Sequence, residues 1–426
     1  MTKWQWLLLQ LTRRLWVRAA LIGLLGIGAA IVATLAETLV PWNPGVDISA
    51  DAVNSILTII ASSMLTVTTF SLSVMTSAYR SATSNATPRA TRLLIQDHMS
   101  QNVLSTFIGS FLFSIVGIVV LKTGAYGPQG RAVLFGVTIL VIALIVVSLL
   151  KWIDYLTQLG RVEKAADRVE QATRQAISLR LSQPFLGGQP LRREERVPET
   201  AKTICSNQSG YVQHIDMQHL HDCVKEAGAR VYLGVVPGHF VFDHAPLARI
   251  VLSSERPDGE EADEQAMEAV GKALKEAITI GQERSFDQDP RFGFCVLGEI
   301  ATRALSPGIN DSGTAIDIIG RLTRLLGLWS DEQSEAVAEV EFPDIYVPPI
   351  EETDLFEDAF MQIARDGASH IEIQLRLRKA LRALGQTGSV AFRQAAKEQA
   401  ALALKRANAA LGMEEDKARL GAVTIE

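Results

Sequence analysis

The chain has 426 residues, of which 48% are hydrophobic and 21% charged, with a formal net charge of −6 at pH 7. This high hydrophobic content is typical of a membrane protein rather than of an ordinary soluble enzyme. Residues 1–150 carry nine basic and four acidic side chains, whereas residues 151–426 carry 32 and 43. The acidic second part excludes nucleic acid as a partner, because phosphate backbones bind basic faces.

Four apolar segments precede residue 155, and each has about the 20 residues needed to cross a bilayer. We expect transmembrane helices at about residues 19–40, 55–78, 102–121 and 132–153. The first segment is longer than a signal-peptide core, which predicts a retained span. Basic residues concentrate before the first span, between the second and third, and after the fourth. The positive-inside rule therefore places both termini in the cytoplasm.

The second span is rich in hydroxyl groups. Residues 62–77 read SSMLTVTTFSLSVMTS, in which nine of sixteen side chains carry a hydroxyl. Steps of four and three residues keep one direction on a helix. They predict a single stripe that contains Ser62, Thr66, Thr69, Ser73 and Thr76 and ends at Arg80.

Two interpretations of this stripe are open. Hydroxyls can bond to carbonyls of their own helix and let neighbouring helices pack closely. Alternatively, the stripe faces water and offers oxygen ligands to partly dehydrated ions. Four spans from one chain can hardly enclose a pore, so the second interpretation requires a homo-oligomer with this span at its axis.

The remainder of the chain indicates a mixed fold. A helix is expected to continue from the fourth span without a break to about Leu181, followed by a linker to about residue 200. Short strands interrupted by one helix are expected from residue 209 to about 251. Further along the chain we predict helices at 262–281, 290–305 and 312–328 and a strand within 337–349. A helical hairpin is predicted at 354–384 and 389–411.

The predicted organisation is thus a membrane α-helical domain joined to a cytoplasmic α+β domain with a small β unit and a C-terminal helical hairpin. Its expected parts are a transmembrane domain at 1–154, a helical extension and linker at 155–200, an α+β domain at 201–350 and a C-terminal helical region at 351–426.

Polar residues concentrate near two predicted helix ends. Asp289 before Pro290 is typical of a helix N-cap, and Asn310 or Asp311 is expected to cap the helix from Ser312. Pairs four residues apart are expected to bond along their helices, namely Glu299 with Arg303 and Asp317 with Arg321. We expect a subunit or ligand contact that involves Asp287, Asp289, Arg291, Arg303, Asn310 and Asp311.

Other chemistry is weakly indicated. Carboxylates gathered in this region could hold Mg²⁺ or act as acid and base, but no nucleophile with a neighbouring base and no phosphate loop accompany them. His219 and His221 point to different helix faces, so a zinc site is not expected. The three cysteines show no CxxC pairing. We predict no enzymatic activity, no catalytic residue, no metal and no cofactor.

The stretch DQDPRFGFCVLGEIATRALSPGINDSGTAIDIIGRL at 287–322 resembles the signature of a bacterial family of predicted membrane proteins, domain of unknown function 2254. The stretches TVTTFSLSV, FIGSFLFSIVG, SGYVQHID and VVPGHFVFDHAPL add to this resemblance, which covers most of residues 20–330. The resemblance implies several spans at the N-terminus and a cytoplasmic mixed domain. We expect the protein in the bacterial inner membrane. It implies no particular activity.

From the residues we predict a homo-oligomeric ion channel whose pore is lined by the second span. Hydroxyl oxygens and an acidic cytoplasmic mouth favour cations, and a monovalent cation and membrane lipid are the expected partners. One alternative is a non-conducting membrane scaffold or signalling protein in which the stripe packs helices. A third is a membrane-bound metal-dependent enzyme that uses Asp287 and Asp289.

Overall fold

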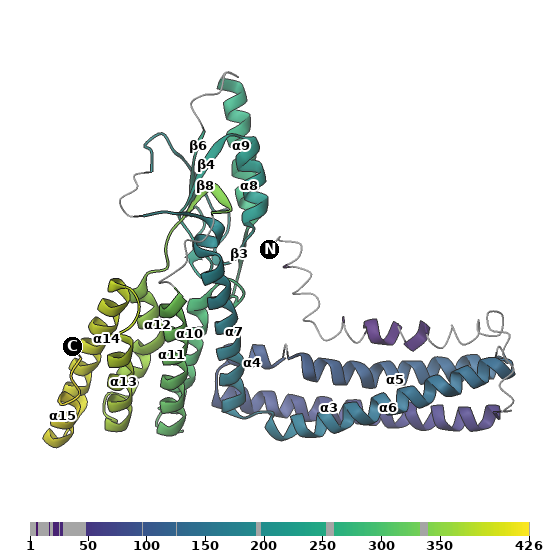
Figure 1. The fold of residues 1–426 in the computed structure, drawn as a ribbon. Coiled ribbons are helices and arrows are strands. Elements are labelled where there is room, and N and C mark those ends of the chain that lie inside the picture. The colour runs from purple at the N-terminus through teal and green to yellow at the C-terminus, as the bar shows by residue number, and fades with distance from the viewer. Residues whose placement is uncertain are drawn as a thin grey trace. The chain divides into compact units, whose positions relative to one another are not determined.

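The computed structural model divides into two compact units, shown in Figure 1. The membrane unit comprises Leu7–Ser84 and Thr91–Ala165, and the mixed unit comprises Met1–Trp6, Asn85–Ala90 and Ala166–Glu426. The structure describes residues 48–425 except 96, 125, 193–196, 253–259 and 333–339, together with residues 6, 17, 20–24 and 26–28.

Long apolar helices make up the membrane unit. They are α3 (Ala50–Asn85), α5 (His98–Lys122) and α6 (Pro128–Gln158), with the short α4 (Pro88–Ile95) between the first two. Within the described residues, three segments are long and apolar enough to cross a membrane: Ala50–Ser84, Met99–Lys122 and Pro128–Gln158. They contain the spans predicted at 55–78, 102–121 and 132–153. The span predicted at 19–40 lies largely outside the described residues, of which 20–24 and 26–28 are helical.

The three helices pack through large apolar side chains. Met64 of α3, Phe107 of α5 and Trp152 of α6 belong to one buried cluster, in which Phe107 is fully buried. A second cluster contains Leu57 of α3 and Leu134 of α6, both fully buried. Close packing of this kind fixes which face of each helix turns inward.

The helix predicted to run unbroken from the fourth span to Leu181 is instead two helices. α6 ends at Gln158, and α7 (Val162–Ser182) begins after a three-residue break. Leu159 is extended, and Gly160 has a φ of +87°, a conformation that only glycine adopts without strain. The backbone there also passes close to α3, because a Cβ on Gly160 would lie 3.4 Å from the carbonyl oxygen of Ala78. The sequence expectation was wrong because it treated this glycine as a helical residue.

Two β-sheets form one part of the mixed unit. A five-stranded mixed sheet has the order β1-β8-β4-β6-β2, and a three-stranded antiparallel sheet has the order β5-β3-β7. The strands are β1 (Gly188–Pro190), β2 (Lys202–Cys205), β3 (Gly210–Ile215), β4 (Ala229–Leu233), β5 (Phe240–Val241), β6 (Pro246–Leu252), β7 (Ile278–Gly281) and β8 (Phe342–Val347). β1 and β4 run parallel to β8, whereas β6 runs antiparallel to β4 and β2.

Two helices contribute to the core of these sheets. α8 (Met217–Glu226) and α9 (Glu260–Ala277) bury Leu220 and Leu274 in a cluster with strand residues such as Ile250. A short 3₁₀ turn, η1 (Pro184–Gly187), leads from α7 into β1. The helix predicted at 262–281 therefore ends early. Its last four residues, rich in β-branched side chains, form β7 and pair with β3 instead.

Helices form the rest of the mixed unit. They are α10 (Pro290–Ala304), α11 (Ser312–Glu332), α12 (Glu352–Asp366), α13 (Ile371–Leu384), α14 (Val390–Ala410) and α15 (Glu414–Gly421). The predicted C-terminal hairpin is not what the structure has, because its first arm is split into α12 and α13, which both contact α14. The buried amide of Gln374 donates to the carbonyl oxygens of Ala364 and Gly367, and these bonds satisfy the end of α12.

Candidate functional site

The hydroxyl stripe of α3 lies on the exposed face of the helix. All six residues predicted to line a pore are exposed: Ser62, Thr66, Thr69, Ser73, Thr76 and Arg80. Residues on the opposite face, among them Ile60, Met64, Ser71 and Met75, are buried. The helices that the structure describes therefore pack on the other side of α3 and leave the stripe exposed.

Every hydroxyl of the stripe donates its hydrogen to the helix backbone. Thr66 Oγ1 donates to the carbonyl of Ser62 at 2.9 Å, Ser73 Oγ to Thr69 at 3.0 Å, and Thr76 Oγ1 to Leu72 at 2.8 Å. Ser62 and Thr69 make equivalent bonds. A hydroxyl that has donated its hydrogen retains lone pairs as acceptors. The face consequently presents acceptor oxygens outward, which suits cations better than anions.

Exposed apolar side chains flank the stripe on both sides. Ile59 and Phe70 lie on one side and Leu65 and Leu72 on the other, and each is more than half exposed. At 100° per residue, these positions lie about 60–80° from the centre of the stripe. Apolar flanks of this kind fit contact with lipid or with another copy of α3.

An acidic residue at the start of the stripe was missed by the sequence analysis. Asp51 is exposed in the first turn of α3, and its carbonyl accepts a hydrogen bond of 2.8 Å from the Ser55 hydroxyl on the same face. Eight turns later the stripe reaches Arg80. The signal is present in the sequence, because Asp51 follows the same four-and-three spacing, but it lies four residues before the span predicted at 55–78.

A different set of hydroxyls packs inside the membrane unit. Ser71 of α3, Ser105 and Ser114 of α5, and Thr138 of α6 are fully buried. Thr138 donates to the carbonyl of Leu134 at 2.7 Å. Small polar residues inside a bundle allow close helix approach. Within the described helices, packing thus uses hydroxyls other than those of the stripe.

The start of α10 carries a network of charged groups in the mixed unit. Asp289 is 2% exposed and accepts two bonds from Arg284, of 2.8 and 3.0 Å, while it also accepts the backbone N–H of Phe292. The predicted N-cap, with Pro290 at the first helical position, is confirmed. Burial raises the pKa of the Asp289 carboxyl, and the Arg284 guanidinium opposes this shift. Gly238 lies against this carboxylate so closely that a Cβ would be 2.4 Å from Asp289 Oδ2.

The neighbouring predicted residues also have partners within the unit. Asp287 accepts hydrogen bonds of 2.9 Å from the Trp6 indole and from the Ser285 hydroxyl. Arg291 donates to Asp354 at 2.6 Å and to Asp358 at 2.7 Å. These contacts raise the pKa of Arg291 against the opposing effect of its burial. No group of three or more His, Cys, Asp or Glu residues among those described is arranged to hold a metal ion.

The other half of the predicted cluster lies elsewhere. Arg303, Asn310 and Asp311 are at the far end of α10 or beyond it, and 15 residues of helix make that distance roughly 20 Å. Asp311 caps α11 by accepting the N–H and hydroxyl of Thr314 at 3.0 and 2.6 Å, which lower its pKa. The structure thus divides the six residues into two groups of three.

The two predicted helical ion pairs have different outcomes. Asp317 pairs with Arg321 at 2.6 Å, as expected. Glu299, in contrast, pairs with Arg89 of α4, a residue 210 positions earlier in the chain. The expectation that Glu299 would pair with Arg303 was wrong because a tertiary partner replaced the local one. Arg89 lies in the first turn of α4, so this contact anchors the segment Asn85–Ala90 within the mixed unit.

Two neighbouring cavities adjoin the network, and no sequence pattern indicates them. Their volumes are about 460 and 350 Å³, and their linings share Pro237, His239 and Arg291. Burial and the Arg291 charge lower the pKa of His239, so the imidazole is neutral at pH 7.

Comparison with known proteins gives a family but no activity. The model of the family described as "Predicted membrane protein (DUF2254)" matches residues 12–383. Two similar proteins are the uncharacterized proteins Mb1321c of Mycobacterium bovis and Rv1290c of Mycobacterium tuberculosis, both 23% identical over 272 residues. The match covers 63% of this chain and 50% of each relative, so the chain spans about half the length of the curated relatives it matches. No solved structure matches.

Proposed function

Because the chain belongs to the family of predicted membrane proteins DUF2254, we propose that it forms a homo-oligomer that conducts cations along the hydroxyl stripe of α3. The observation that carries the proposal is the exposure of Ser62, Thr66, Thr69, Ser73 and Thr76 on an otherwise apolar helix. A polar stripe that faced hydrocarbon would leave its acceptor oxygens without partners, whereas water and ions at a symmetry axis would solvate them.

Charge and geometry favour cations in this scheme. The stripe hydroxyls donate inward to the backbone and present acceptor oxygens outward. Asp51 adds a carboxylate at one end. Weak oxygen ligands repeated along a path allow an ion to enter and leave without being trapped. We infer monovalent cations as the permeant class, and a bacterial inner membrane with both termini in the cytoplasm as the setting.

Oligomerisation is part of the proposal, since one copy offers only one stripe. The exposed apolar flanks Ile59, Leu65, Phe70 and Leu72 are suited to contact equivalent residues of neighbouring copies. Around a closed ring, such contacts would leave the stripes facing a common axis.

Two other functions are less well supported. A non-conducting scaffold would use the stripe only to pack helices, but buried hydroxyls such as Ser105 and Ser114 already occupy the packed interior. A metal-dependent enzyme would need free carboxylates, whereas Asp287 and Asp289 are held by Trp6, Ser285 and Arg284. We therefore propose a non-enzymatic function.

Potassium flux from liposomes that contain the purified protein tests the proposal. We expect flux above that of empty vesicles. The Thr66→Val, Thr69→Val double variant should lose about thirtyfold, since two weakened oxygen layers at roughly 1 kcal/mol each cost roughly 2 kcal/mol together. The matched control is Ser63→Ala with Thr68→Val, which removes two hydroxyls that point away from the stripe and should leave flux unchanged. Absence of flux together with a monomeric mass in mild detergent would refute the proposal.

A further inference from the structure

Arg180 is a buried arginine in the last turn of α7, with 7% of its surface exposed. Three other buried or half-buried arginines of the mixed unit have carboxylate partners: Arg284 has Asp289, Arg291 has Asp354 and Asp358, and Arg321 has Asp317, Asp167 and Glu170. The half-buried Arg378, Arg393 and Arg406 donate to backbone carbonyls instead. Arg180 forms neither an ion pair nor a hydrogen bond with any part of the chain that the structure describes. It is therefore an exception that the fold of this unit does not explain.

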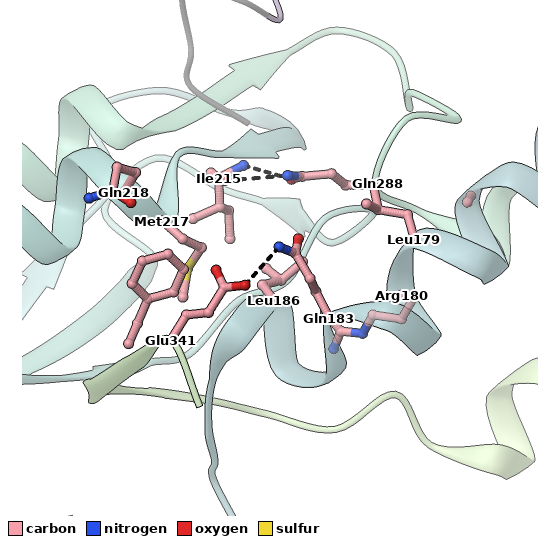
Figure 2. A pocket seen from close by; sticks show the side chains of 11 residues that line it. Leu179, Arg180, Gln183, Leu186, Ile215, Met217, Gln218, Gln288 and Glu341 are labelled. Atoms are coloured by element: carbon pink, nitrogen blue, oxygen red, sulfur yellow. Dashed lines mark hydrogen bonds between the residues drawn. The ribbon is translucent and has the colours of Figure 1, made fainter. Parts of the chain in front are cut away.

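Arg180 lines a small cavity of about 90 Å³ between α7, β3, α8 and the start of β8, shown in Figure 2. The other polar side chains of its lining are Gln183, Gln218, Gln288 and Glu341. Apolar side chains from α7 and from the sheet core complete the lining. The volume exceeds the ~10–15 Å³ that one water occupies by the same measure, but it is too small for a nucleotide.

The polar groups around the cavity are partly held in place. Gln288 accepts the N–H of Ile215 at 3.0 Å and donates to the carbonyl of the same residue at 3.4 Å, so its amide is fixed (Figure 2). Gln183 Nε2 donates to Glu341 Oε1 over a long 3.3 Å. Glu341 is itself an exposed residue. The glutamate is thus free to move away from Gln183 at little cost.

A guanidinium in this position is energetically expensive. Burial lowers the pKa of Arg180 to about 10, and no other cause contributes to the shift. The group is still positively charged at pH 7. Carbonyls at the C-terminal end of α7 offset part of this charge through the helix dipole, by about 0.3–1 kcal/mol. That is less than the several kcal/mol that an unpaired buried ion costs, and a negative partner in the cavity would offset the remainder.

We propose that this cavity binds a small oxyanion, of the phosphate or carboxylate class, with Arg180 as its charge partner. The guanidinium donates in a planar fork that matches two oxygens of such an anion. Gln183 contributes a further amide donor once it leaves Glu341. The cavity size limits the ligand to a free anion or to a single small anionic group. Because the site lies wholly in the mixed unit, it does not depend on ion conduction.

Thermal unfolding of the full chain in mild detergent, titrated with inorganic phosphate or with acetate at constant ionic strength in chloride, tests the site. We expect a saturable rise in Tm with at least one of the two anions, which also identifies the class. In Arg180→Met the apparent Kd should rise at least tenfold. Arg174→Met is the matched control, because Arg174 is an exposed arginine on the same helix and should leave the anion response unchanged.

Two further variants keep the test decisive. Glu341→Gln removes the carboxylate nearest the site and should tighten anion binding severalfold, whereas Arg180→Lys should retain weak binding because it keeps the charge. Without added anion, Arg180→Met should be at least as stable as the natural chain, since an apolar side chain replaces an unpaired ion. A Tm response that is absent from the natural chain, or equal in Arg180→Met, overturns the proposal.

Discussion

Asp289 gives a sharp test of how the mixed unit is held together. Replacing it by alanine removes the N-cap of α10, at a cost of about 1 kcal/mol. It also leaves Arg284 without its bidentate partner. Arg284 is 18% exposed, so we use the low end of the free-energy cost of breaking a buried ion pair, about 3 kcal/mol. The opening free energy of α10 should therefore fall by about 4 kcal/mol, which is a factor of roughly a thousand.

Hydrogen–deuterium exchange of the full chain in detergent measures this change directly. Amides in the first turns of α10 should exchange about a thousandfold faster in Asp289→Ala. Asp311→Ala is the matched control, because Asp311 also caps a helix by accepting a backbone N–H, of Thr314, but is exposed. It should accelerate exchange in α11 only about fivefold, as expected for a cap alone. If exchange in the two helices accelerates equally, the buried ion pair does not stabilise α10.

Two further predictions concern the same unit. Burial raises the pKa of the Cys295 thiol from 9.0 to about 12. At pH 8 iodoacetamide should therefore alkylate this thiol about a thousandfold more slowly in the native chain than in urea, which mass spectrometry measures. Comparable alkylation rates would contradict the raised pKa. Gly293→Ala should destabilise the unit by about 3 kcal/mol, because the new Cβ would lie 1.8 Å from Thr173 Oγ1. Gly327→Ala should be neutral or slightly stabilising, because no atom lies within 4 Å of its new Cβ. Thermal unfolding of both glycine variants distinguishes a true steric contact from a general effect of alanine.

Features that depend on local signals could be predicted from the sequence. Asp289 followed by Pro290 indicates a helix start from two adjacent residues, and the structure confirms it. The spacing of Thr66, Thr69 and Ser73 indicates one face of a helix, and the structure places these residues together on an exposed face. Such signals survive folding because neighbours along the helix determine them.

Features that depend on distant partners could not be predicted. Glu299 was expected to bond Arg303 on its own helix, but Arg89 takes that place. The helix expected to continue past the fourth span breaks at Gly160, where the chain passes Ala78 of α3. Burial of Arg180 likewise follows from the meeting of elements that lie far apart in the sequence. In each case the decisive neighbour is distant along the chain, and no local pattern carries that information.

The position of β8 in the central sheet has a consequence for biosynthesis. β8 is the last strand in the chain, yet it lies between β1 and β4. Until Phe342–Val347 has left the ribosome, β4 has an unpaired edge and the sheet remains open. Exposed strand edges invite pairing with other chains. Translation of the 90 positions from Leu252 of β6 to Phe342 of β8 is thus the interval in which the nascent chain is most in need of protection by a chaperone.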